Sequence, residues 1–184
     1  MKLVVAITGA SGVRYGIESV RLLEDADVES HVVVTEAGRR VMAEESDVAP
    51  EDVHALADVV HHPDDVGAAV ASGSFDFDGM LVCPCSMKTL GYVANGIAEG
   101  LVPRVADVCL KEERRLVLVP RESPMARTHL ENMLEAHDAG AVVAPASPGF
   151  YTDVESLDDA VEVFAAKLLD GFGVETDAMR RWSG

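Results

Sequence analysis

The chain has 184 residues, enough for one domain with a sizeable core, and we expect a single domain over residues 1–184. Its 32 acidic and 15 basic residues give a formal net charge of −17, which argues against binding to nucleic acid or to anionic membranes, where Lys and Arg must neutralise phosphates. The acids are spread along the whole chain, so we interpret them as a solvated surface of the kind found in halophilic proteins. An anionic ligand would need a locally basic pocket.

The three cysteines do not form a disulfide framework or a metal site. Cys83 and Cys85 are too close together and too isolated for zinc, and Cys109 leaves an odd count. We expect all three thiols to be buried small apolar groups and no metal to be bound. The first residues lack the features of a signal peptide and no apolar run approaches a membrane span, so we expect a cytoplasmic protein.

Apolar runs typical of strands alternate with helical patterns along the chain. Lys2–Ile7 is continuously apolar, which predicts a buried strand, and Val13–Leu23 has apolar residues at helical spacing. In chain order we then expect a strand over Glu29–Val34, a helix over Ala37–Glu45, strands over Asp58–His62 and Met80–Cys83, helices over Ser86–Ala94 and Arg104–Glu113, a strand over Leu116–Pro120, a helix over Pro124–His137, a strand over Ala141–Ala144 and a helix over Ser156–Phe172. Residues 46–79 show the weakest pattern. The alternation predicts an α/β, doubly wound parallel sheet with helices on both faces and a ligand at the carboxyl ends of the strands.

Hydroxyl side chains follow three of these strands. Gly9 and Ser11 lie in the turn after the first strand, where a phosphate could approach the backbone at a helix N-terminus. Thr35 follows the second strand, and Ser86 and Thr89 follow the strand at Met80–Cys83. Each feature alone also fits a tight turn or a plain N-cap. Together they suit a phosphorylated cofactor that lies across the strand ends.

Positive charge gathers between residues 104 and 122. Arg121 and Glu122 directly follow a buried strand, where Arg121 could clamp a phosphate and Glu122 could transfer a proton. An exposed ion pair explains the same two residues equally well. Tyr151 lies in a loop shaped by glycine and proline, where its phenol could donate to a phosphate or pack against the fold. We interpret His61 and His62 as surface residues, because no metal-ligand spacing surrounds them.

The chain resembles the UbiX flavin prenyltransferases, formerly called aromatic acid decarboxylases. The resemblance rests on GASG, PCSMKTL, ADVCLKEERRLVLVPRESP, HLENM and PASPGFY, and extends nearly from end to end. It implies a flavodoxin-like (Rossmann-like) domain that assembles as a homododecamer and binds reduced FMN without a metal. It also implies transfer of a dimethylallyl group from dimethylallyl monophosphate to flavin N5 and C6, which makes prenylated FMN for a UbiD-type decarboxylase.

The resemblance also implies roles for individual residues. FMN contacts would come from Gly9, Ala10, Ser11, Thr35, Ser86, Met87, Thr89 and Arg121, and contacts to the prenyl donor from Arg104, Lys111, Tyr151, Lys167 and Trp182. The catalytic residues would be Glu122, Glu45, Lys111 and Tyr151. Two positions depart from the family pattern. Lys167 stands where an arginine is common, and it keeps the charge but loses the planar fork. Glu36 places an acid beside Thr35.

Two other functions share the expected fold. One is an FMN-dependent peptidyl-cysteine decarboxylase, which would need a catalytic histidine in the helix after the first strand. Residues 14–20 contain none. The other is a non-catalytic FMN carrier, which would leave the LKE and PRE segments without a purpose.

Overall fold

The computed structural model describes residues 1–149 and 154–179. Within them a sheet of six parallel strands has the order β3-β2-β1-β4-β5-β6. The strands are β1 (Lys2–Ile7), β2 (Glu29–Val34), β3 (Val59–Val60), β4 (Gly79–Cys85), β5 (Arg115–Pro120) and β6 (Val142–Val143). This confirms the doubly wound, flavodoxin-like class. The chain winds outward from β1 to β3 and then from β4 to β6, so the topological switch point lies between β1 and β4.

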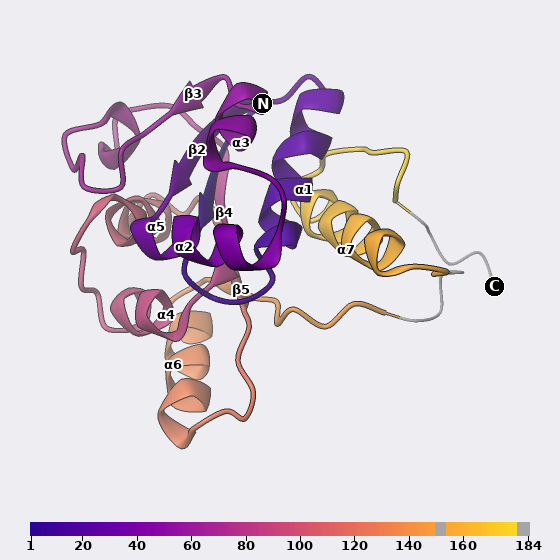
Figure 1. Cartoon of the computed structure of the whole chain (residues 1–184). Helices are drawn as coiled ribbons and strands as arrows, with labels where there is room; N and C mark the ends of the chain where they lie inside the picture. Colours follow the sequence, from indigo (N-terminus) through magenta and orange to yellow (C-terminus); the bar gives the residue numbers. More distant parts are fainter. Residues whose placement is uncertain (150–153, 180–184) are drawn as a thin grey trace.

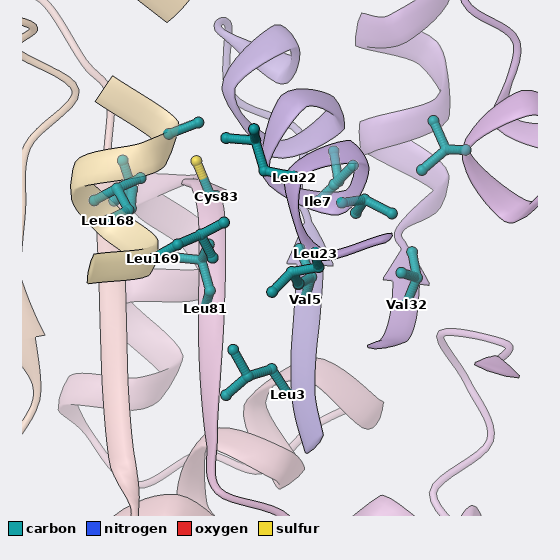
Figure 2. Close-up of a cluster of buried hydrophobic side chains, with 14 of the residues drawn as sticks. Leu3, Val5, Ile7, Leu22, Leu23, Val32, Leu81, Cys83, Leu168 and Leu169 are labelled. Carbon is teal, nitrogen blue, oxygen red and sulfur yellow. The ribbon is translucent and has the colours of Figure 1, made fainter. Parts of the chain in front are cut away.

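Helices cover both faces of this sheet (Figure 1). They are α1 (Val13–Asp25), α2 (Glu36–Glu45), α3 (Pro50–Leu56), α4 (Met87–Ala94), α5 (Leu101–Lys111), α6 (Arg127–Asp138) and α7 (Leu157–Asp170), with a 3-10 turn, η1, at Ala69–Ala71. Figure 2 shows the core on one face, where leucines of α1 and α7 meet alternate side chains of β1 and β4. The opposite core joins the other side of these strands to α4, α5 and η1.

Two glycines let helices approach the strand ends closely. A Cβ on Gly16 of α1 would lie 2.1 Å from the carbonyl oxygen of Cys83, and one on Gly38 of α2 would lie 2.5 Å from that of Ile7. Real Cβ atoms do not approach an oxygen so closely, so both helices need glycine at their contact with the sheet. This contact fixes where the α1 and α2 N-termini stand relative to the carboxyl edge.

The sequence missed two elements and misplaced several boundaries. Helix α3 and turn η1 both lie in the segment that showed no clear pattern. Pro50 opens α3, and the Asp52 carboxylate accepts from the Ala49 amide at 2.9 Å. Helix α5 begins three residues before the predicted start, because Pro103 is tolerated in a first turn. Helix α6 begins later than predicted, at Arg127. None of the described helices is long and apolar enough to cross a membrane.

Candidate functional site at the topological switch point

A cavity of about 230 Å³ opens at the carboxyl edge of the sheet, beside the switch point. Hydroxyl groups from three strand ends meet there: Thr35, Ser86 and Thr89 as predicted, and after β1 Thr8 in place of the predicted Ser11. The lining includes Thr8 and Gly9 after β1, Thr35 after β2, and Ser86 and Thr89 after β4. Residues of the 63–64 segment, Tyr92 of α4 and the start of α5 close the other side. Ligands of open α/β sheets bind at this place in the topology.

Thr35 connects the end of β1 to the start of α2. Its side-chain oxygen accepts from the Gly38 amide at 3.0 Å and so caps α2. The same hydroxyl donates to the carbonyl oxygen of Ile7 at 3.3 Å. The N-terminus of α2, with its unpaired amides and its positive dipole end, is thereby held beside the cavity.

Ser86 caps α4 at the neighbouring strand end. Its Oγ accepts from the Thr89 amide at 3.2 Å and lies 3.0 Å from the Thr89 hydroxyl. The Ser86 amide donates to Oγ1 of Thr8 at 2.8 Å, and that hydroxyl donates to the carbonyl oxygen of Pro84 at 2.7 Å. Two helix N-termini and four Ser and Thr residues therefore border one cavity, an arrangement that suits an anionic oxygen-rich ligand.

The N-terminus of α1 differs from those of α2 and α4, because a carboxylate of the protein already holds it. Oε2 of Glu45 accepts from the Gly12 amide at 2.7 Å, across 33 residues of chain. A negative charge at a helix N-terminus is favourable. The contact places Glu45 at the glycine loop that was predicted to receive a phosphate. The geometry therefore directs an external anion toward α2 and α4.

The other predicted flavin contacts lie outside the cavity lining. Ala10 is buried and Ser11 is half-buried in the loop after β1, and Met87 packs partly against the core at the start of α4. Arg121 is exposed directly after β5, and Glu122 beside it is half-buried. These residues follow β1, β4 and β5 and share the carboxyl edge with the cavity.

The predicted phosphate ligands are not gathered in one place within the chain. Arg104 donates to the Ala71 carbonyl oxygen at 3.1 Å and pairs with Asp107 at 2.8 Å. Lys111 pairs with Glu112 at the far end of α5, before β5 begins, whereas Arg121 follows β5. The six residues of that strand separate the two by roughly 20 Å.

Of the remaining predicted contacts to the prenyl donor, the structure describes Lys167 alone. Lys167 is exposed in the last turn of α7 and pairs with Asp170 at 3.3 Å. Tyr151 and Trp182 lie outside the described residues.

Several residues at the cavity were missed by sequence reasoning. Thr8 was not among the predicted contacts, although a hydroxyl directly at a strand end was a usable signal. Lys88 brings a cation to the lining, with its ammonium 5.4 Å from the centre of the Tyr92 ring. Asp64 and Glu99 come from loops whose approach to the cavity only the tertiary structure sets.

One histidine interpretation was wrong. His62 is exposed as predicted, but His61 is half-buried and its Nε2 lies 2.9 Å from Nδ1 of the buried His31. Burial, with a smaller effect of His31, lowers the pKa of His61. The prediction for the cysteines is confirmed: all three are free and buried, and burial raises the pKa of Cys85 to about 12.

Comparison with known proteins shows the family of this chain. The sequence matches the flavoprotein family over residues 1–167. It is 50% identical to flavin prenyltransferase UbiX of Deinococcus radiodurans, over 98% of this chain and 93% of that protein. It is 46% identical to the mitochondrial flavin prenyltransferase PAD1 of Saccharomyces cerevisiae, over 100% of this chain and 76% of that protein. The chain belongs to the UbiX flavin prenyltransferase family. It is therefore a transferase.

Solved structures extend this comparison to the fold. A crystal structure of AnUbiX (PadA1) in complex with FMN and dimethylallyl pyrophosphate superimposes with a TM-score of 0.97 at 45% identity, over 100% of this chain and 97% of that chain. The dodecameric FMN-dependent UbiX-like decarboxylase from Escherichia coli O157:H7 gives 0.96 at 46% identity, with 100% of both chains covered. The cysteine decarboxylase TvaF is only 22% identical and shares the fold alone.

Proposed function

We propose that this protein transfers a dimethylallyl group from dimethylallyl monophosphate to N5 and C6 of reduced FMN. The observation that carries the proposal is the convergence of hydroxyls and of the α2 and α4 N-termini on one cavity at the switch point. Membership of the flavin prenyltransferase family supports the reaction class. The product would serve a UbiD-type decarboxylase.

The cavity suits the phosphate end of FMN better than the whole cofactor. Its volume of about 230 Å³ is below the roughly 300–1,000 Å³ of pockets that enclose a drug-sized ligand. The Ser86–Thr89 pair would donate to the phosphate, and Thr35, whose proton goes to the Ile7 carbonyl oxygen, would accept from a ribityl hydroxyl. Gly9 keeps the loop after β1 against the start of α2, because a Cβ there would lie 2.4 Å from that of Ala37. The ring would extend along the carboxyl edge toward Ser11, Met87 and Arg121.

Reduced FMN, when bound, supplies the electron-rich N5 and C6 atoms that form the new bonds. The protein residues would bind the partners and manage charge and protons. Arg121 would balance negative charge on the flavin side of the site. Glu122, half-buried at the end of β5, would accept and return a proton. Glu45 would hold the loop that carries Ser11 through its bond to the Gly12 amide.

Lys111 and Lys167 would act on the site of a neighbouring copy. Within one chain Lys111 and Arg121 are at opposite edges of the sheet, so one subunit cannot use both on the same donor. In an assembly, Lys111, Lys167, Arg104 and Tyr151 would stabilise negative charge as the phosphate leaves, and Trp182 would cover the prenyl pocket. Mixing Lys111→Gln with Glu122→Gln subunits tests this. Shared sites predict that mixed oligomers regain activity that neither variant has alone, whereas inactive mixtures would place each complete site in one chain.

The face of α6 supports assembly with further copies of this chain. Leu130 and Leu134, one turn apart, are 53% and 58% exposed. Helix α6 lies against α4 and extends away from the sheet (Figure 1), which leaves these leucines on the outside. We propose a homododecamer, as in the Escherichia coli O157:H7 relative. Light scattering of Leu130→Glu/Leu134→Glu should show smaller species, and an unchanged mass would remove α6 from the interface.

The decisive experiment is the mass of the flavin after reaction. FMN, a reductant and dimethylallyl monophosphate should yield prenylated FMN with chelator present, in a high-salt buffer suited to a halophilic cytoplasmic protein. The same reaction with the diphosphate identifies the donor, because the family relative was solved with dimethylallyl pyrophosphate. Unmodified FMN with both donors would reject the proposal. Bound but unmodified FMN would indicate a carrier.

A further inference from the structure

We propose that Thr8 is a positioning residue of the flavin site, which fixes Ser86 and the start of α4 against the end of β1. The assignment rests on the proposed function. Thr8 directly follows β1 and is only 1% exposed, yet it belongs to the lining of the cavity. A buried hydroxyl needs hydrogen-bond partners within the protein, and the partners of Thr8 indicate its role.

The hydroxyl of Thr8 has no proton left for a ligand. A threonine hydroxyl has one proton and two lone pairs. The proton goes to the Pro84 carbonyl oxygen at 2.7 Å, and one lone pair accepts the Ser86 amide at 2.8 Å. The Thr8 amide also donates to the Pro84 carbonyl oxygen, at 3.3 Å. All three bonds span the switch point, from the end of β1 to the end of β4.

The effect of Thr8 reaches the cavity through Ser86. With its amide fixed by Thr8, Ser86 caps α4 and shares a hydrogen bond with the Thr89 hydroxyl. These two hydroxyls have two protons, and only one is used between them. The other is available for a ligand oxygen in the cavity. Thr8 therefore fixes the positions of the Ser86–Thr89 hydroxyl donor and of the α4 N-terminus. The phosphate would then bind to a preformed site.

Binding of FMN by folded variants tests this role. Thr8→Val keeps the shape and removes both bonds, and we expect it to raise the Kd for FMN about tenfold, equivalent to about 1.4 kcal/mol. Thr8→Ser keeps the hydroxyl and should stay within about threefold of wild type. Ser19→Ala is the matched control, because Ser19 is equally buried and bonds only within α1, to the Tyr15 carbonyl oxygen at 2.8 Å. It should lower the melting temperature and leave the Kd unchanged.

The outcomes separate this role from the proposed function. A wild-type protein that does not bind FMN rejects the proposed function. If wild type and folded Thr8→Val bind FMN equally well, only the role of Thr8 is rejected, as it is if Thr8→Ser binds as weakly as Thr8→Val.

Should Thr8→Val not fold, hydrogen exchange of the Ser86 amide in FMN-free wild type decides. A protected amide supports the preformed site, and a freely exchanging one overturns it.

Discussion

Salt should strengthen the binding of FMN to this protein, opposite to the usual effect of salt on an anionic ligand. Among the residues that the structure describes, the charged ones in the cavity lining are Glu36, Asp64 and Glu99, which are acidic, and Lys88, which is basic. Three carboxylates against one ammonium leave a net charge of minus two around the proposed phosphate subsite. Arg40 offsets part of this, because it pairs with Glu36 at 3.4 Å.

The size of the effect follows from simple electrostatics. Two unit charges about 8 Å apart in water interact by roughly 0.5 kcal/mol. Depending on how far Arg40 neutralises Glu36, a phosphate of about two negative charges would therefore meet a repulsion of about 1–2 kcal/mol without salt. The Debye length falls from about 10 Å at 0.1 M to about 3 Å at 1 M, so roughly half of the repulsion remains at the lower concentration and little at the higher. The expected gain of about 0.4–0.8 kcal/mol corresponds to an about two- to fourfold lower Kd.

Calorimetric titration of FMN at 0.1 M and 1 M potassium chloride measures this gain, with circular dichroism to confirm equal folding. Asp64→Asn/Glu99→Gln should bind more tightly at 0.1 M and lose most of the salt dependence. Glu24→Gln/Asp27→Asn makes the same change in net charge at a different hollow, next to the end of α1, and should behave as wild type. Binding that weakens with salt, or a control pair that acts like the cavity pair, would refute this reasoning.

Three further predictions concern packing, pH and chemistry. In chemical denaturation, Gly16→Ala should lower the free energy of unfolding by about 3 kcal/mol, because the new Cβ would meet the Cys83 carbonyl oxygen. The control Gly91→Ala should be neutral or stabilising, because the nearest atom to its new Cβ lies at 3.4 Å. The free energy of unfolding should fall as the pH drops below about 6.5, because His61 takes up a proton more readily in the unfolded chain than in the folded state, where its pKa is lowered. His61→Gln should flatten this part of the pH profile of the melting temperature. Glu122→Gln should keep FMN and slow prenylation in single-turnover mass spectrometry, and unchanged turnover would remove its assigned role.

The sequence by itself determined the fold class and part of the cavity lining. Continuous apolar runs such as Lys2–Ile7 predict a parallel sheet because strands covered on both faces need no polar side. Parallel strands place their carboxyl ends at one edge, so Thr35, Ser86 and Thr89 were expected to meet there, and they do. These inferences needed only local pattern and topology.

Only the tertiary structure decided which charges share a site. The carboxylates of Asp64 and Glu99 reach the cavity through loops whose path no periodicity encodes. Lys111 and Arg121 are ten positions apart in the sequence, yet a buried strand carries them to opposite edges of the sheet. The contact of Glu45 with the Gly12 amide joins positions 33 residues apart. Such distances depend on how helices pack on the sheet, which a one-dimensional pattern does not contain.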